Sequence, residues 1–162
     1  MKAMNIVRSA RFAVFLLGAL AIAGCAKQPD QTAALGGAAA VPGSQQDFIV
    51  NVGDRVFFES DSSELTLQAR ETLDKQAQWL NQYSRYAFTI EGHADERGTR
   101  EYNIALGARR AQTVQAYLVS RGVMAQRMHT ISYGKERPVA VCNDISCWSQ
   151  NRRAVTVLNA NS

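Results

Sequence analysis

Charged side chains gather in one stretch of the chain, EGHADERGTREYNIALGARRA, at residues 91–111. It holds four arginines, four carboxylates and a histidine. A carboxylate accepts hydrogen bonds from an ammonium group, whereas an arginine offers two parallel donors to a carboxylate. A cleft that presented both groups would be complementary to a zwitterion. The best placed pair is Asp95 and Arg110.

The elements on either side of this stretch decide where these groups point. YAFTIEG, at residues 86–92, alternates like a strand, and a helix is predicted from about Arg100 to Arg121. Thr99 is a plausible N-cap, and Gly122 suits the position after the helix end. Asp95 therefore lies on a loop beside unpaired N–H groups of a helix N-terminus, which favour an ionised carboxylate.

The helical period separates the two arginines of the predicted helix. With about 100° per residue, Asn103, Leu106 and Arg110 form one narrow stripe that faces the loop. Arg109 is turned away from that stripe, toward solvent or another ion pair. The predicted ligand-binding residues of the helix are therefore Asn103, Leu106 and Arg110.

Three other uses of the charged stretch are conceivable. A metal site of His93, Asp95 and Glu96 lacks a second histidine nearby, and the adjacent arginines oppose a cation. Acid–base hydrolysis by Asp95 and Glu96 is disfavoured, because sequence neighbours seldom face one substrate from two sides. The third use, a structural ion pair between Asp95 and Arg110, stays open.

The beginning of the chain reads as an export signal. Residues 1–11 carry three basic side chains and no acid, and the apolar run at residues 12–23 is shorter than the roughly 20 residues of a membrane-spanning helix. An anchoring helix is the alternative. The stretch IAGC, at residues 22–25, resembles a bacterial lipobox, which implies removal of residues 1–24 and lipidation of Cys25.

Charge and cysteine content argue against a nucleic-acid-binding protein and against a zinc site. The chain has 18 Lys and Arg against 14 Asp and Glu, and removing the leader leaves 15 against 14, so no nucleic-acid footprint is expected. With Cys25 lipidated, Cys142 and Cys147 remain as a pair that would form a disulfide in an oxidising compartment. The alternative, half of a zinc site, lacks a second ligand pair.

The rest of the chain predicts one α+β domain. Residues 25–46 are small and polar and read as a flexible linker after the lipidated cysteine, and the domain is expected at residues 47–160. DFIVNV (47–52) and RVFF (55–58) look like strands, and a stripe of Ala69, Leu73, Ala77 and Leu80 predicts a helix. Two more strands are expected in HTISYG (129–134) and RAVTVLN (153–159).

The motif GHADERGTREYNIALGARRA closely resembles the signature of OmpA-like peptidoglycan-binding domains, a G-H-x-D loop followed by a Y-N-x-x-L-x-x-x-R-A helix. ADERG, ISYGKERP (131–138) and QNRRAV (150–155) are similar to the lipoproteins of that family. The resemblance covers about residues 52–158. It implies a two-layer sandwich of two main helices on a mixed sheet, with a β-α-β-α-β-β core and a possible extra N-terminal strand, DFIVNV.

The resemblance also implies roles for single residues. Asp95 and Arg110 match the family residues that bind the ammonium and the carboxylate of meso-diaminopimelate in the peptidoglycan stem peptide. Asp61 matches an aspartate of the loop after the first core strand, where Ser60 replaces the usual Phe, so that Leu65 or Phe58 would have to supply the apolar wall. The remaining matches are the pocket residues Asn103 and Leu106, Thr99 on the rim, and Asn151, Arg152 and Arg153, which would support the arginine side of the cleft.

The partners implied are therefore peptidoglycan, the outer membrane through the lipid anchor, and TolB with other Tol proteins during cell division. His93 is interpreted as a structural loop residue. No cofactor, metal or enzymatic activity is expected. The alternative function is a docking module for Tol proteins in which Asp95 and Arg110 form a purely structural pair.

Overall fold

The computed structural model describes residues 40–159, which lie in a compact unit that starts at Ala38. The predicted leader, the lipidation site at Cys25 and most of the predicted linker lie outside the described residues. None of the helices between residues 40 and 159 has both the length and the apolar composition of a membrane-spanning segment.

Four strands form one mixed sheet in the order β1-β4-β2-β3, with β1 at Arg55–Phe57, β2 at Phe88–His93, β3 at Met128–Gly134 and β4 at Arg153–Leu158. Strand β4 is antiparallel to both β1 and β2, whereas β2 and β3 run parallel. The parallel pair requires a crossover, which α3 at Arg100–Ser120 supplies. This is the α+β architecture predicted from the sequence.

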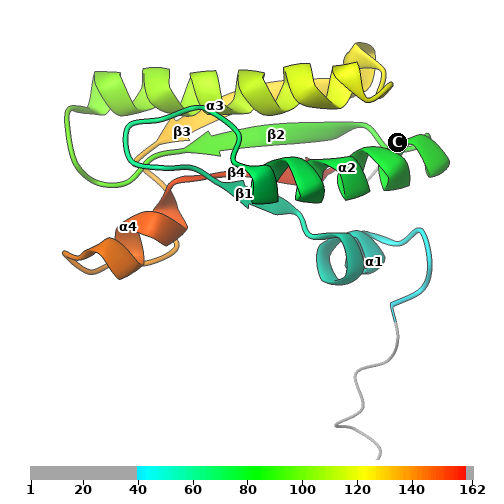
Figure 1. Cartoon of the computed structure of the whole chain (residues 1–162), viewed down its shortest axis with the longest axis horizontal. Coiled ribbons are helices and arrows are strands. Elements are labelled where there is room, and N and C mark those ends of the chain that lie inside the picture. Colours follow the sequence, from blue (N-terminus) through cyan, green and yellow to red (C-terminus); the bar gives the residue numbers. More distant parts are fainter. Residues whose placement is uncertain (1–39, 160–162) are drawn as a thin grey trace, which may run out of the picture. The chain divides into compact units, whose positions relative to one another are not determined.

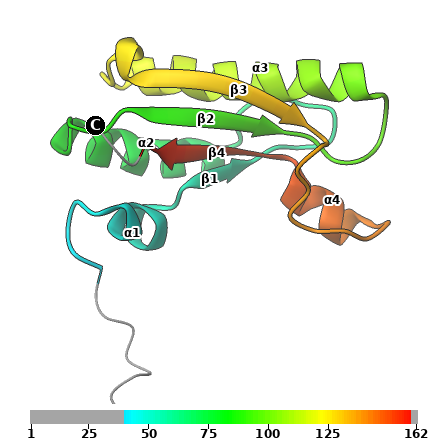
Figure 2. The ribbon, with the colours of Figure 1, turned by 180° about the vertical axis from the view of Figure 1, so that it is seen from behind.

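The two long helices, α2 at Leu67–Gln82 and α3, pack on the sheet and enclose the core (Figures 1 and 2). The predicted stripe of α2 is buried as expected, and it meets alternate residues of the central strands because side chains alternate across a strand. The fully or nearly buried aliphatic and aromatic core residues include Leu73, Ala77, Leu80, Phe88, Ile90, Val114, Leu118 and Ala154.

The helix termini follow the predicted caps. Thr99 caps α3 by accepting a hydrogen bond from the N–H of Tyr102 at 3.2 Å. Gly122 follows the helix end with a φ of +86°, a conformation that glycine adopts without the penalty of a side chain. The boundaries of α3 thus agree with the prediction within one residue.

The predicted extra N-terminal strand is wrong. Residues 45–52 form helical turns, α1 at Gln45–Asp47 and η2 at Phe48–Val52. Asp47 accepts hydrogen bonds from the Trp79 indole and the Asn51 amide, both at 2.8 Å, and the buried Phe48 ring packs against Trp79. These tertiary contacts override the strand propensity of a β-branched and aromatic run.

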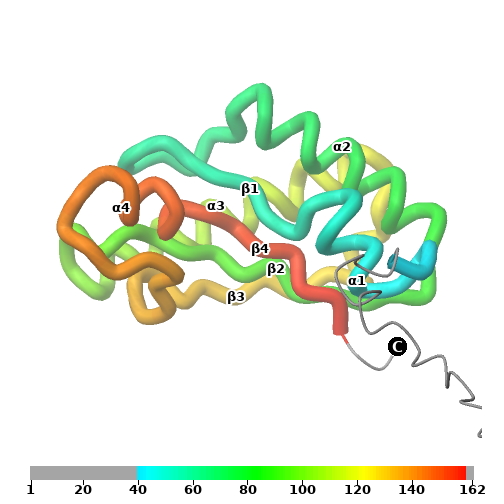
Figure 3. The backbone as a smooth tube through the Cα atoms, turned by 90° about the horizontal axis from the view of Figure 1, so that it is seen from below, coloured from blue at the N-terminus to red at the C-terminus, as the bar shows by residue number. Residues whose placement is uncertain are grey.

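The sequence also gave no sign of a short helix, α4 at Ile145–Asn151, which lies between β3 and β4. Asp144 caps it by accepting from the N–H of Ser146 at 2.7 Å. The disulfide between Cys142 and Cys147 confirms the predicted pairing, with Cα atoms 5.7 Å apart. The tube in Figure 3 shows α4 and the loops around it at the end of the sheet that is remote from α1.

Candidate functional site

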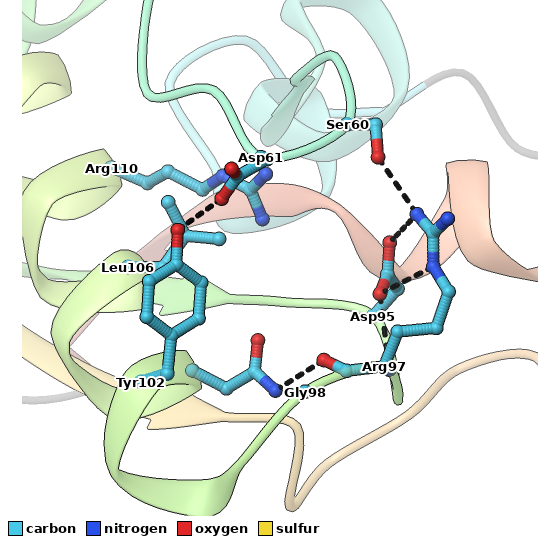
Figure 4. A pocket seen from close by; sticks show the side chains of 9 residues that line it. Ser60, Asp61, Asp95, Arg97, Gly98, Tyr102, Leu106 and Arg110 are labelled. Atoms are coloured by element: carbon cyan, nitrogen blue, oxygen red, sulfur yellow. Dashed lines mark hydrogen bonds and ion pairs between the residues drawn. The ribbon is translucent and has the colours of Figure 1, made fainter.

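A pocket of about 260 Å³ opens at the end of the domain where α3 begins. Three segments line it: the loop after β1, the loop after β2 and the first half of α3 (Figure 4). Its lining residues are Ser60, Asp61, Asp95, Arg97, Gly98, Tyr102, Asn103, Leu106 and Arg110. The loop carboxylates and the helix guanidinium that the sequence predicted to converge thus border one cavity.

Close approach of α3 to the sheet fixes how deep its side chains reach. A Cβ atom on Gly92 of β2 would lie 1.8 Å from the carbonyl oxygen of Gly107 on α3. Only two glycines allow the two backbones to approach this closely. Gly107 lies one residue after Leu106 and three before Arg110, so this contact sets the position of both pocket residues.

Asn103 joins the helix to the loop that carries the carboxylate. Its side-chain amide donates to the carbonyl oxygens of Arg97, at 2.7 Å, and Thr99, at 3.1 Å. Asn103 is itself 2% exposed, so these bonds lie in a protected environment. Asn103 therefore holds the loop at residues 97–99 against the first turn of α3.

Arg110 is fully buried, and its guanidinium is fixed by backbone carbonyls. It donates to Ser62 O at 2.8 Å, His93 O at 2.8 Å and Glu59 O at 3.1 Å. A guanidinium has five N–H donors, so two remain without a partner in the described part of the chain. Burial lowers the pKa of Arg110 to about 10, helped by the nearby charge of Arg152, and the group stays protonated at neutral pH.

Asp95 is almost buried, at 7% exposure, and faces cations other than Arg110. Its carboxylate pairs with the Arg97 guanidinium at 2.7 Å and with Arg152 at 3.4 Å. Burial would raise the pKa of Asp95, but the hydrogen bonds from Arg97 and then Arg152 hold it below its ordinary value. Asp95 and Arg110 thus form no ion pair with each other among the described residues.

The loop after β1 brings Asp61 over the pocket in a left-handed conformation, with a φ of +56°. Asp is one of the few residues besides glycine that adopt this region at modest cost. Its carboxylate accepts a hydrogen bond from the hydroxyl of Tyr102, which links the loop to α3 across the pocket (Figure 4).

The other predicted site residues lie outside the pocket lining, each in a different place. Thr99 caps α3 and does not line the pocket. Arg152 reaches Asp95 and also donates to Phe58 O at 3.0 Å, so it supports the carboxylate side of the cleft, not the predicted arginine side. Asn151 and Arg153 bind backbone groups outside the cleft, at residues 139–140 and at Arg137.

Replacement of the usual Phe by Ser60 changes the wall in a way the sequence did not predict. Leu65 does not line the pocket, and the ring of Phe58 lies beneath the Arg110 guanidinium, 5.1 Å from it. The hydroxyl of Ser60 instead accepts a hydrogen bond from Arg97 at 2.8 Å. The sequence analysis did not predict Arg97, Gly98 and Tyr102 as pocket residues. The spacing of four between Tyr102 and Leu106 places both on one helix face and could have indicated Tyr102.

Helix α4 flanks the pocket through Trp148. The Trp148 indole donates to the Glu96 carboxylate at 3.1 Å, and the Arg97 guanidinium lies 4.3 Å from the centre of its ring. Cys147, beside Trp148, is held by the disulfide. The disulfide therefore restrains the position of the Trp148 ring that Arg97 contacts.

His93 does not line the pocket, although its backbone carbonyl accepts a hydrogen bond from Arg110. Its ring is 2% exposed, stacks with Tyr133 and has no hydrogen-bonding partner among the described residues. Nor do three or more His, Cys, Asp or Glu side chains of residues 40–159 come together as they would around a metal ion. The pocket is thus lined by charged side chains of both signs, Asp61, Asp95, Arg97 and Arg110.

The chain is similar to known proteins over most of its length. The profile of the OmpA family matches residues 57–153. The chain is 66% identical over 150 residues to the peptidoglycan-associated lipoprotein of Rhizobium meliloti, covering 90% of this chain and 85% of that protein. It is 58% identical over 164 residues to the one of Brucella melitensis, covering 98% of each.

Solved structures show the same fold. The crystal structure of the peptidoglycan-associated lipoprotein from Burkholderia pseudomallei superimposes with a TM-score of 0.64 at 42% identity, covering 65% of this chain and 90% of that one. The C-terminal domain of Helicobacter pylori MotB gives a TM-score of 0.63 over 67% of this chain and 86% of that one, at only 21% identity, which shows likeness of fold alone.

Proposed function

The chain belongs to the OmpA family, within its peptidoglycan-associated lipoproteins, and from this premise we propose that its pocket binds peptidoglycan without covalent chemistry. The ligand group proposed is meso-diaminopimelate of the stem peptide, whose side chain ends in an ammonium and a carboxylate on one carbon. Asp95 accepts from the ammonium, and the two free N–H groups of Arg110 donate to the carboxylate.

The observation that carries this proposal is one pocket with a buried anion and a buried cation that do not neutralise each other. Arg110 is held by backbone carbonyls, none of which cancels its charge. Each charge-assisted hydrogen bond contributes about 1.5–3 kcal/mol when desolvated. Immobilisation of the ligand offsets part of this, so the affinity for one stem peptide is modest.

The lipid anchor proposed at Cys25 turns modest affinity into firm attachment. An anchored domain and a polymeric wall meet at high effective concentration, and many weak sites then act together. The proposed role is a tie between the outer membrane and the cell wall during envelope constriction, as part of the Tol–Pal system. The tie has no catalytic step.

The experiment is pull-down of the soluble part, residues 26–162, on purified sacculi and titration with stem peptides that contain diaminopimelate or lysine. Asp95→Ala and Arg110→Ala should each abolish retention, and the diaminopimelate peptide should bind better because only it offers Arg110 a second carboxylate. Arg109→Ala is the matched control, because Arg109 does not line the pocket and should bind like wild type.

Because Arg110 is buried, its variant needs a check of folding by circular dichroism, and Asp95→Asn provides a nearly isosteric second test. Wild-type retention of both Asp95→Asn and a folded Arg110→Ala protein would refute the assignment of the pocket. Binding of wild type to both peptides with equal affinity would refute the diaminopimelate assignment alone.

TolB and other Tol proteins are the further partners that we propose on the family resemblance. In the alternative function, protein docking is the main role and Asp95 and Arg110 are a structural pair. The pairing of Asp95 with Arg97 and Arg152 argues against the second half of that alternative. Competition between TolB and the stem peptide for the domain would test whether the two share a surface.

A further inference from the structure

The Asp95 carboxylate has no acceptor site left for a ligand. One oxygen accepts from the backbone N–H and the Nε of Arg97, both at 3.2 Å. The other accepts from an Nη of Arg97 at 2.7 Å and from Arg152 at 3.4 Å. A carboxylate has about four lone-pair sites, and all four are taken. An incoming ammonium must therefore displace one of these donors.

The donors differ in how easily they can leave. Arg152 is 5% exposed and is also tied to the carbonyl of Phe58, so its position belongs to the fold. The Arg97 side chain is 44% exposed, and its fork-shaped pair with Asp95 borders the pocket (Figure 4). Because the Arg97 end of the pair is open to solvent, its charge is partly screened, and Arg97 exchanges with other cations more readily than the buried Arg152 does. Arg97 is thus the donor that can move.

Two further contacts hold the Arg97 guanidinium beside Asp95, and either could keep it bound to the protein after it leaves the carboxylate. Ser60 accepts from it at 2.8 Å, and the Trp148 ring lies 4.3 Å from it. An arginine over an indole face gains cation–π attraction without any carboxylate. When the pair with Asp95 breaks, the guanidinium can stay on Trp148 and vacate the carboxylate.

We propose that Arg97 is an internal competitor for the ligand ammonium: in the free protein it occupies the ammonium position on Asp95, and the ligand binds by displacing it. This inference rests on the proposed function and deepens it. A ligand with an ammonium alone exchanges one cation for another at Asp95 and gains little. A ligand that also brings a carboxylate to Arg110 gains a contact that Arg97 cannot imitate. Arg97 is therefore a specificity-determining residue that penalises simple amines.

The test is calorimetric titration of wild type and Arg97→Ala with the diaminopimelate and the lysine stem peptides. Removal of the competitor should tighten binding of the diaminopimelate peptide by roughly two- to fivefold, as expected for loss of an ion pair that solvent partly screens. The lysine peptide should gain at least as much, so that the preference for diaminopimelate narrows. Arg97→Lys, which keeps a cation but loses the fork, should fall between the two proteins.

Arg100→Ala is the matched control, since it removes the same charge nearby while Arg100 pairs with Glu136 and does not line the pocket. It should leave both affinities unchanged. Ser60→Ala, which removes one anchor of Arg97, should tighten binding in the same direction but less.

Weaker or unchanged binding of the diaminopimelate peptide by Arg97→Ala would overturn the inference, and weaker binding would mean that Arg97 is a direct ligand contact. This failure is distinguishable from failure of the proposed function. In the first case, Asp95→Asn still abolishes wild-type binding. In the second, Asp95→Asn binds like wild type whatever happens at Arg97.

Discussion

His93 is a buried histidine that the structure keeps neutral. Burial lowers its pKa to about 4, and the positive charges of Arg153 and Arg137 add to the effect. The Glu91 carboxylate lies 3.6 Å from its Nε2, beyond hydrogen-bonding distance, and Tyr133 stacks on the ring. A charge on this ring would therefore have the Glu91 carboxylate nearby but no hydrogen bond among the described residues to stabilise it.

This arrangement predicts a loss of stability in mild acid. In the unfolded chain the histidine binds a proton below about pH 6.5, whereas in the fold it resists protonation down to about pH 4. Between these values the unfolded state holds more protons, so the free energy of unfolding falls as the pH falls. We expect a loss of about 2 kcal/mol between pH 7 and pH 4.5 in urea titrations.

His93→Gln should flatten this pH dependence, because glutamine does not titrate. His129→Gln is the control, since His129 is exposed on β3, and it should keep the wild-type slope. A His93→Gln protein that still loses the same stability between pH 7 and pH 4.5 would assign the effect to other groups.

At the scale of elements, the contact between β2 and α3 is the one on which the pocket depends most. A methyl group on Gly92 would meet the backbone of Gly107 at 1.8 Å, so the helix would have to move away. Gly92→Ala is expected to cost about 3 kcal/mol, as overpacking of a tight core does, and to weaken ligand binding because Leu106 and Arg110 move with the helix. Chemical denaturation and peptide titration measure both effects.

Gly107→Ala provides a graded comparison. Its nearest obstacle is the Ser132 hydroxyl at 2.4 Å, which can rotate, followed by the Gly92 carbonyl oxygen at 2.8 Å. Alanine also favours a helix over glycine by about 1 kcal/mol. The Gly107→Ala protein should therefore lose less stability than Gly92→Ala, and the reverse order would show that the approach is governed by another contact.

Much of this arrangement could be predicted from the sequence, because it rests on local signals. The stripe from Ala69 to Leu80 and the cap at Thr99 follow from helical periodicity and from side-chain oxygens that serve unpaired N–H groups. DFIVNV was predicted wrongly, because its conformation is set by Trp79, distant in sequence. Helix α4 is a seven-residue element that its cap and disulfide stabilise, which is too short for periodicity to reveal.

In the candidate site, too, some features could be predicted from the sequence and others could not. Asp95 and Arg110 could be predicted to border one pocket, since a helix period and a loop position suffice. Their actual partners could not, because Arg152 is 57 residues from Asp95 and Ser60 is 37 residues from Arg97. Hydrogen bonds between such distant segments depend on the register of the sheet, which sequence patterns do not specify.

At the scale of the whole domain, the N-terminal segment of the described chain is locked at Gly43. The Gly43 carbonyl accepts from Arg85 at 2.6 Å and from the Tyr86 hydroxyl at 2.8 Å, while its N–H donates to Asp47 at 2.8 Å. Its φ is +76°, and a Cβ atom would lie 2.4 Å from the Tyr83 ring. Both features require glycine at this position.

Gly43→Ala should therefore lower the free energy of unfolding by about 1–3 kcal/mol and expose the segment near residue 43 to proteolysis. Gly53→Ala is the matched control, because Gly53 has a φ of +92° but its Cβ would meet only Thr72 at 3.6 Å. Gly53→Ala should lower the free energy of unfolding by less than Gly43→Ala does. Stem-peptide affinity should be unchanged in both variants, and a loss of affinity in Gly43→Ala alone would show coupling between the lock and the pocket.

Gly43 binds Arg85, just after the end of α2, whereas the pocket is lined by the start of α3. The end of α2 and the start of α3 lie at opposite ends of the domain (Figure 1). Any tension between an anchored N-terminus and a captured wall fragment would pass lengthwise through the sheet and both long helices. The three hydrogen bonds at Gly43 would then bear this force before the sheet and the ligand pocket do. In single-molecule force spectroscopy, the hydrogen bonds at Gly43 should break before the strands of the sheet separate. The extended N-terminal segment should then lengthen by a few residues while the wall fragment stays bound.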